Sequence, residues 1–373
     1  MLFATHGSVF GSWATQIPLI KARLHIDPGT LGLVLLCLAA GGVFAMQGAS
    51  RVMGRLGGLP LLRGSLLLSA GALLAASLAP NPPALAAALG AMGMGLGTLD
   101  LVMNAQAVTV ERRLRRPVMS GLHGMWSLGT LLGTFAGAAL LWWLPGPLEA
   151  GVVAACGAAA ALLANRFLLP MTPERRDAPR GIGLLQQPGL LATGAAMAMA
   201  FAVEGALLDW SAVFLRETRH VPDALAGIGY GVFAGCTLSG RLIGDRLRAR
   251  WGDLALLRGA FVCGAALLLA AAAPGPWLPI LCFAATGLAL GNIAPILFNA
   301  VGQRGADYGA EGSSRALGSA VSFAYAGVSV APPLFGFVAR HSSLGAALCC
   351  AAGVAFVLGS CTLLPGRWRL QPG

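Results

Sequence analysis

Charged side chains are scarce in this sequence: they make up 10% of its 373 residues, whereas hydrophobic residues make up 57%. A soluble domain usually carries about 25% charged residues, so this deficit excludes an ordinary water-soluble globular protein. Most of the chain consists instead of apolar stretches of about 20 residues, which are long enough to cross the hydrocarbon core of a bilayer. The composition therefore indicates an integral membrane protein.

The alternation of polar and apolar residues that marks a membrane β-strand is also missing. A transmembrane barrel would show alternating segments of about ten residues, but here Leu, Ala, Gly and Val form long continuous runs. In lipid, each run must satisfy its own backbone hydrogen bonds, which a helix does. We therefore expect an all-α membrane protein.

Several kinds of chemical site are absent from the sequence as well. The eight cysteines show no CxxC or metal-ligand spacing, and they lie in apolar runs, where small packing residues are expected. No P-loop, GxSxG, HExxH or kinase-like set occurs. We therefore expect no enzyme activity, no metal and no cofactor. The net charge of +11 lies in short loops between apolar runs, so it does not predict nucleic-acid binding.

Pro, Gly and charge clusters divide the chain into twelve predicted transmembrane helices. Their ranges are 2–20, 29–49, 59–79, 83–108, 118–143, 147–169, 189–215, 224–244, 254–273, 277–302, 313–338 and 343–364. If both termini are cytoplasmic, all but five of the 25 Lys and Arg residues fall on the inner side, as the positive-inside rule expects. The first apolar run has no small-residue cleavage site, so we expect no cleaved signal peptide. The sequence thus predicts a multi-pass protein of the cell (inner) membrane with cytoplasmic ends.

An internal repeat relates the two halves of the chain. PLLRGSLLLSAGALLAASLAP (60–80) matches ALLRGAFVCGAALLLAAAAP (255–274), and the offset stays near 195 residues. Six helices and a cytoplasmic linker separate the copies, so both halves enter the membrane in the same orientation. The predicted parts are an N-terminal six-helix bundle at 1–169, a cytoplasmic linker at 170–188, and a C-terminal six-helix bundle with a short tail at 189–373. Parallel halves of this kind are typical of transporters that bind their substrate at the midplane.

One loop motif points to a family. The stretch GRLIGDRLRARWG (240–252) resembles the G-x(4)-D-R-x-x-x-[RK] signature loop of the major facilitator superfamily. The resemblance implies the major facilitator fold, with twelve helices in two six-helix parallel-repeat halves. It also implies a charge relay at the helix ends that stabilises one conformation. In the equivalent loop GASRVMGRLGG (48–58) a glycine replaces the acid. We therefore expect a conformational latch at Asp245, Arg246 and Arg55.

Three further stretches narrow the resemblance. They are GTLDLVMNAQAVTVE (97–111), SGLHGMWSLGTLLG (120–133) and AFAVEGALLDW (200–210). They are similar to stretches in a bacterial branch of inner-membrane permeases related to the fucose:proton symporters, and the likeness spans essentially all twelve helices. In the fucose symporters, acids in helices 1 and 4 are linked to sugar binding and proton coupling, which implies such a role for Asp100. Predicted helix 1 has no acid, and this is a departure from that scheme.

Three acids, Asp100, Glu204 and Asp209, lie within apolar helices without a predicted intramembrane Lys or Arg beside them. An ionised side chain at the bilayer centre costs roughly 2.5–3.5 kcal/mol. Such a carboxyl can load and release a proton as a cavity alternates between two sides; the alternative is a carboxyl that hydrogen-bonds a neighbouring helix. Asp209 lies near the outer helix end, where we expect water to reach it.

Helix geometry suggests partners for the first of these acids. At 1.5 Å per residue, Asp100, Asn104 and His123 lie about 12, 6 and 8 Å above the inner ends of their helices. They are therefore predicted to share one polar cluster. We expect proton coupling through Asp100, Glu204 and His123, since a histidine titrates near neutral pH; a single histidine on a helix is also commonly a plain hydrogen-bonding residue.

Aromatic rings and neutral amides away from the membrane interfaces suit a polar or ring-bearing solute, although such residues also commonly fill helix contacts. The predicted substrate-binding residues are Trp13, Gln16, Asn104, Trp126, Asp209, Trp210, Asn292, Asn299 and Tyr325.

These features predict a secondary active transporter that moves a small polar, sugar-like solute by alternating access. Without an ATP-binding motif, we expect it to use an ion gradient, most simply protons. The alternatives are a proton-driven multidrug or metabolite exporter, which would attract hydrophobic cations to unpaired acids, and a transporter-like sensor or enzyme. The expected partners are the solute, protons and the lipid bilayer, and the expected functional unit is a monomer that binds no nucleic acid.

Overall fold

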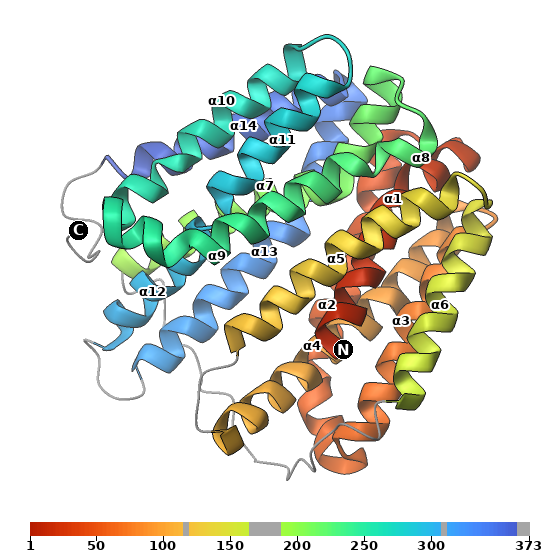
Figure 1. The fold of residues 1–373 in the computed structure, drawn as a ribbon, viewed down its shortest axis with the longest axis horizontal. Coiled ribbons are helices and arrows are strands. Elements are labelled where there is room, and N and C mark those ends of the chain that lie inside the picture. Colours follow the sequence, from red (N-terminus) through yellow and green to blue (C-terminus); the bar gives the residue numbers. More distant parts are fainter. Residues whose placement is uncertain (115–118, 164–187, 307–311, 364–373) are drawn as a thin grey trace. The chain divides into compact units, whose positions relative to one another are not determined.

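The computed structural model describes residues 1–114, 119–163, 188–306 and 312–363, and all regular elements in these ranges are helices (Figure 1). Their bounds are α1 Leu2–Arg23, α2 Pro28–Leu56, α3 Gly58–Leu78, α4 Pro82–Leu114, α5 Met119–Leu141, α6 Gly146–Leu163, α7 Pro188–Arg219, α8 Asp223–Ala226, α9 Ile228–Leu257, α10 Gly259–Ala272, α11 Trp277–Leu290, α12 Ile293–Ala306, α13 Gly312–His341 and α14 Leu344–Cys361. The short α8 coincides with the start of predicted helix 8, most of which is α9, and α11 and α12 together form predicted helix 10. The elements therefore correspond to the twelve predicted helices, and the fold class is confirmed.

Most of the described helices are long and apolar enough to cross a membrane. Nine segments meet this criterion within the described ranges, and a tenth is added if Arg246–Leu257 and Gly259–Ala272, which meet at a bend of 63°, count as one span. The first helix, α1, is not among the nine. It buries several polar side chains, including His6, Ser12 and Gln16, so its polar face is turned toward other helices.

Side-chain caps explain where several helices begin. The Oδ1 of Asp27 accepts hydrogen bonds from the backbone N–H groups of Gly29 at 2.9 Å and Thr30 at 3.3 Å, and Pro28 occupies the first position of α2. The hydroxyl of Ser343 likewise accepts from the N–H of Ala346 at 3.0 Å at the start of α14. These bonds satisfy donors that have no partner within the helix.

The chain divides into two compact units. The N-terminal unit comprises Met1–Arg175 and His220–Gly231, and the C-terminal unit comprises Arg176–Arg219 and Val232–Gly373. Within the first, α1 packs on α5, α2 on α4, and α3 on α4 and α6; within the second, α7 packs on α13, and α10 on α11 and α14. The packing of each unit thus follows the sequence repeat. The predicted linker, 170–188, lies almost entirely outside the described residues, and the predicted domain boundaries stay a prediction.

Four glycines allow α1 and α5 to cross in close contact. A Cβ added to Gly7 or Gly11 on α1, or to Gly129 or Gly133 on α5, would overlap a backbone carbonyl oxygen of the facing helix. The spacing of four residues places each pair on one face of its helix, which is the small-xxx-small pattern of tight membrane helix pairs. The crossing of α1 and α5 therefore depends on the absence of side chains at these positions.

Two glycines form equivalent turns in the two halves. Gly57, between α2 and α3, has φ 82° and ψ 163°, and Gly252, at the kink within α9, has φ 73° and ψ 163°. This backbone region is essentially restricted to glycine. The two positions are related by the repeat offset, so the turn after the second helix of each half has the same geometry.

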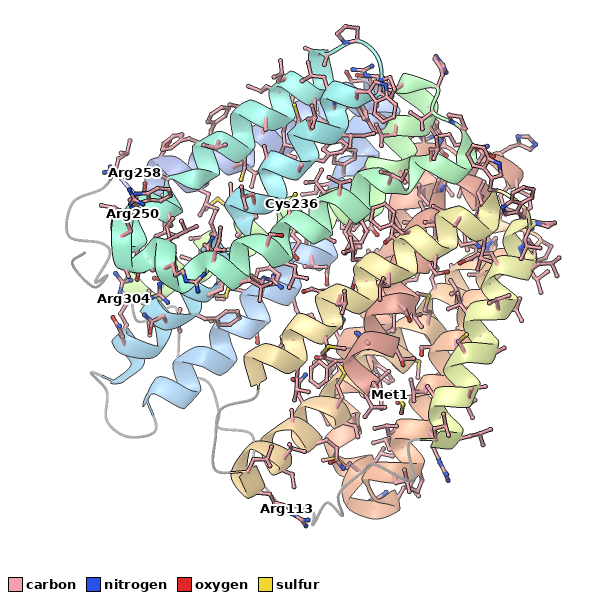
Figure 2. The ribbon with its side chains drawn as sticks, viewed as in Figure 1. Met1, Arg113, Cys236, Arg250, Arg258 and Arg304 are labelled. Atoms are coloured by element: carbon pink, nitrogen blue, oxygen red, sulfur yellow. The ribbon has the colours of Figure 1, made fainter. Side chains whose placement is uncertain are left out.

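Basic side chains gather at one end of the C-terminal unit. Figure 2 shows Arg250, Arg258 and Arg304 at this end. Arg304 on α12 donates to the backbone oxygen of Gly189 and, at 2.8 Å, to the hydroxyl of Thr193, both on α7. Such clustering is the pattern that the positive-inside rule expects for a cytoplasmic end, while the orientation itself stays a prediction.

Alanine substitutions at two glycines of α5, Gly129 and Gly124, should affect the stability of the protein differently. Gly129→Ala forces a methyl group into the backbone of α1, so we expect it to lower the free energy of unfolding by about 1–3 kcal/mol. Gly124→Ala meets no atom within 4 Å, so the higher helix propensity of alanine should leave stability unchanged or raise it by up to about 1 kcal/mol. Thermal unfolding of the purified protein in detergent compares the two variants, and equal shifts would contradict the close crossing.

Candidate functional site

His6, on α1, is buried and uses both ring nitrogens in hydrogen bonds. Its Nε2 lies 3.2 Å from the carbonyl oxygen of Leu96 on α4, and its Nδ1 lies 2.7 Å from the indole Nε1 of Trp126 on α5. An indole N–H only donates and a carbonyl oxygen only accepts, so Nδ1 accepts and Nε2 carries the proton. His6 is therefore a neutral imidazole in this arrangement, and it links three helices.

The structure brings the residues of the predicted inner cluster to the region of this histidine. The Asn104 amide donates to the backbone oxygen of Asp100 at 2.8 Å and to its carboxyl Oδ1 at 3.1 Å. Asp100 and His123 both act electrostatically on His6. The His123 ring also meets the ring of Phe3 in an edge-on arrangement, with 5.3 Å between centroids. The N-terminal unit thus holds these polar groups together, and their role in proton coupling stays a prediction.

A second polar group lies in the first turn of α6. Glu149 is fully buried (0% exposed), and its Oε1 accepts a hydrogen bond from the Ser12 hydroxyl at 2.7 Å. Its Oε2 accepts from the Gln16 amide, which also donates to the backbone oxygen of Gly146 at 2.9 Å. A Cβ on Gly137 of α5 would lie 3.0 Å from Glu149 Oε1. Three helices therefore enclose this carboxyl, and the side chains bonded to it are neutral.

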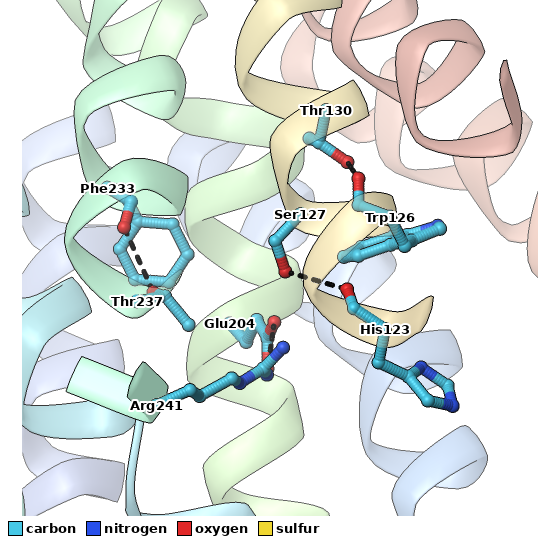
Figure 3. Close-up of polar contacts among 8 residues, drawn as sticks. All are labelled: His123, Trp126, Ser127, Thr130, Glu204, Phe233, Thr237 and Arg241. Atoms are coloured by element: carbon cyan, nitrogen blue, oxygen red, sulfur yellow. Dashed lines mark hydrogen bonds and ion pairs between the residues drawn. The ribbon is translucent and has the colours of Figure 1, made fainter. Parts of the chain in front are cut away.

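Glu204, on α7, has a cationic partner in the C-terminal unit. Its Oε1 lies 3.8 Å from an Nη of Arg241 on α9, and both side chains are about one-third exposed (Figure 3). The expectation that no intramembrane Lys or Arg accompanies Glu204 was therefore wrong. Arg241 lies close to the predicted end of its helix, but its long side chain extends back along the bundle.

Asp209, one turn beyond Glu204, is buried. Only 4% of it is exposed, which contradicts the expected access of water to this end of α7. Among the described residues, its Oδ1 has no hydrogen-bond partner, and neither does the hydroxyl of Ser211. The neighbouring ring of Trp210 stacks on Phe335 of α13, with 5.0 Å between centroids.

The other predicted solute-binding residues occupy different environments. Trp13 is fully buried, and within the described part of the chain its indole N–H is unpaired, as is that of its repeat partner Trp210. Asn292 is buried at the break between α11 and α12, whereas Asn299 and Tyr325 are partly exposed on α12 and α13. The fully buried rings offer no surface to a solute in this conformation, so solute binding by this set stays a prediction.

The loop predicted at 240–252 is part of α9 and ends at its Gly252 kink, and the ion pair found there differs from the predicted one. Arg248 forms a two-pronged pair with Asp253, with Nε–Oδ1 at 2.6 Å and Nη2–Oδ2 at 3.1 Å, and Asp253 is buried. The side chain of Asp245 lies outside the described residues, and Arg246 and Arg55 are exposed. The predicted latch at these three residues therefore stays a prediction, and Arg248–Asp253 is the described ion pair of this loop.

Sequence reasoning missed three residues that the structure places in polar contacts: His6, Glu149 and Asp253. His6 and Glu149 lie near predicted helix ends, where polar residues are ordinarily solvated. The polar composition of α1 was a signal that could have pointed to them, because buried Ser12 and Gln16 side chains need hydrogen-bond partners on other helices. In the described ranges, no group of three His, Cys, Asp or Glu residues could hold a metal ion.

A family model and three related proteins each match most of this chain. The family model that matches residues 1–332 is described as Major Facilitator Superfamily. An MFS-type transporter of Yersinia pestis is 34% identical over 94% of this chain and 91% of its own length. Transporter y4wD of Sinorhizobium fredii is 29% identical, over 92% and 90%. The membrane protein MosC of Rhizobium meliloti is 28% identical, over 98% and 89%.

Solved structures show the same fold at low sequence identity. A mutant of the nucleoside transporter NupG aligns with a TM-score of 0.81 at 14% identity, covering 97% of both chains. A bacterial homologue of the human lysosomal transporter Spinster, in an inward-facing and occupied conformation, aligns with a TM-score of 0.70 at 13% identity, covering 97% of this chain and 95% of that one.

The His6–Trp126 hydrogen bond should contribute measurably to stability. Trp126→Phe removes the donor to a buried imidazole nitrogen, and an unpaired buried acceptor costs about 1–3 kcal/mol. Chemical or thermal unfolding in detergent should show a loss of this size. Trp277→Phe, at a residue that is 73% exposed, is the matched control and should shift stability by less than about 0.5 kcal/mol. Equal losses in both variants would argue against the bond.

Proposed function

Because the chain belongs to the major facilitator superfamily, we propose that it moves a small polar solute across the cell membrane by alternating access, driven by protons. The chain is a transporter of the superfamily, as its relatives are. The proposal adds the class of solute, the coupling ion, and cytoplasmic ends in the inner membrane. The observation that carries it is the arrangement of the acids within the helices.

Asp100 is the acid best suited to proton coupling. Its carboxyl accepts a hydrogen bond from the neutral amide of Asn104, and it lies in the electrostatic surroundings of His6, on which His123 also acts. An acid in such surroundings can bind a proton when its site is open to one side and release it on the other. The sequence resemblance to the fucose:proton symporters supports the same role for Asp100, because in those proteins an acid on helix 4 is linked to proton coupling.

The partners of the acids favour a polar solute over a hydrophobic cation. A multidrug exporter would need an accessible, unpaired carboxylate for its cationic substrate, but Glu204 lies beside Arg241 and Asp209 is buried. Asp100 and Glu149 accept hydrogen bonds from side chains of their own unit. The neutral side chains of Asn299 and Tyr325 are partly exposed, and such groups suit hydroxyl-bearing or ring-bearing solutes.

Candidate solutes can be ranked on these grounds. Sugars and nucleosides combine hydroxyl groups with a ring, and the fold is shared with a nucleoside transporter. A thermal-shift screen of the purified protein against sugars, amino sugars, nucleosides, amino acids and organic cations would identify the class. The solute that raises the unfolding temperature then serves in the transport assays below.

Asp100→Asn should abolish proton-driven accumulation of the solute in proteoliposomes, because an amide cannot bind and release the coupling proton. Uptake down the solute's own gradient should persist, which shows that the variant is folded and binds. Glu217→Gln, at an exposed acid near the end of α7, is the control and should accumulate solute like the wild type. Full accumulation by Asp100→Asn would refute the coupling assignment.

The Glu204–Arg241 pair predicts how the protein responds to a cation. Arg241→Gln leaves the carboxylate of Glu204 without its cation, so the affinity for tetraphenylphosphonium should rise, by about fivefold for a pair worth about 1 kcal/mol. Arg250→Gln, at an exposed residue of the same helix, should not change it. Calorimetric titration measures both, and tight binding of this cation by the wild type would favour an exporter of hydrophobic cations instead.

A further inference from the structure

We propose that Glu149 is a proton-binding site that holds α1 against α6 in its protonated form, and that it is separate from the acids assigned above. The proposal rests on the enclosure of this carboxyl by Ser12, Gln16 and Gly137, and not on proton coupling at Asp100.

Among the described residues, no cation pairs with Glu149 to balance an ionised carboxylate. Its described partners, the Ser12 hydroxyl and the Gln16 amide, are neutral. The N-terminus of α6 contributes only the partial charge of a helix dipole. A fully buried carboxylate without a paired cation is strongly disfavoured. The closed arrangement therefore favours the neutral acid.

No other titratable or charged side chain among the described residues forms a hydrogen bond or ion pair with Glu149. The helices that pack against α6 are α1, α3 and α5. Their groups, together with the thiol of α6, are His6, Lys21, Arg23, Arg63, His123 and Cys156. The side chains bonded to Glu149 are Ser12 and Gln16, and none of these groups is one of them. Arg63, for example, donates to the backbone oxygen of Ala161, about 18 Å along α6 at 1.5 Å per residue.

The hydrogen-bond geometry decides which oxygen binds the proton. Oε2 faces the N–H of Gln16, a group that only donates at that nitrogen, so a proton on Oε2 would meet another donor. Oε1 faces the Ser12 hydroxyl, which can rotate and accept as well as donate. An O–H bond therefore forms on Oε1 and donates to Ser12 Oγ. Ser12 is the residue that lets the site adapt to both charge states.

Water at the adjacent helix ends supplies and receives the proton. Trp142 and Trp143, in the turn before α6, are 57% and 82% exposed, as expected for rings at a membrane–water interface. Glu149 lies in the first turn beyond them, so a small separation of α1 and α6 admits water to its carboxyl. The proton then leaves Oε1 for that water when the helices part, and returns from it when they close.

The C-terminal unit contains a related feature. In the register that aligns Trp13 with Trp210, Asp209 occupies the position of Ser12. Asp209 is also buried, on the helix that packs against α14 as α1 packs against α6. Each unit therefore has one buried carboxyl on its pair of first and last helices, although the acid lies on opposite members of the pair.

Infrared spectroscopy of the purified protein tests the site directly. The wild type should show the C=O band of a protonated carboxyl at neutral pH. Glu149→Gln should lose this band, Ser12→Ala should shift its frequency, and Asp100→Asn should leave it unchanged. A wild type without such a band would overturn the proposal without any variant. So would a difference spectrum of wild type minus Glu149→Gln without this band, in which any band of the other buried acid, Asp209, cancels. A Glu149 band that Asp100→Asn removes, or that Ser12→Ala leaves unshifted, would also overturn it.

Hydrogen exchange tests the link between the proton and the helix contact. As the pH is raised, the wild type should lose protection at residues 12–16 and 146–149 relative to Glu149→Gln, which stays neutral at every pH and so corrects for the intrinsic pH dependence of exchange. Equal protection in the two proteins across the pH range would show that protonation of Glu149 does not hold the contact. Loss of transport coupling in Asp100→Asn with an intact Glu149 band would leave this proposal standing, because the two sites are independent.

Discussion

The close crossing of α1 and α5 is the constraint on which both polar clusters of the N-terminal unit depend. With only hydrogen atoms at Gly7, Gly11, Gly129 and Gly133, the two backbones come into direct contact. His6 then reaches the indole of Trp126 on the facing helix. Farther along the same crossing, side chains of α1 meet the acid of α6. A wider spacing between α1 and α5 would separate these hydrogen-bond donors from their acceptors. The lipid interior has no water that could take the place of the lost partners.

The three acids within the helices have different neighbouring groups, and we therefore expect them to differ in how they bind a proton. Glu204 faces an arginine, whereas Glu149 is enclosed by neutral donors. Asp100 lies between these cases, beside the amide of Asn104 and in the electrostatic surroundings of the His6 imidazole. A group that must exchange protons during a cycle needs surroundings that commit it to neither state. The proposed coupling site, Asp100, is the middle case, and the part that Glu204 plays in coupling stays a prediction.

The sequence predicted the helices well because lipid leaves few alternatives to them. The third predicted helix, 59–79, differs by one residue at each end from Gly58–Leu78. The break between α11 and α12 was missed, since Gly291 and Asn292 interrupt an otherwise apolar run and the close approach of Gly291 to α9 is a tertiary feature. The side-chain partners of the acids were harder to predict than the helices. The contact between Glu204 and Arg241 depends on helix rotation and side-chain reach, which apolar length does not encode.

The equivalent turns at Gly57 and Gly252 bear on the history of the chain. The two glycines have similar backbone angles, but the residues beside them differ in charge. Arg248 and Asp253 form an ion pair in the second half, and the corresponding residues of the first half, Met53 and Gly58, are uncharged. A half-length ancestor that was copied and fused would already have contained this glycine. After fusion, the two copies diverged in the electrostatics of this loop while the path of its main chain was retained.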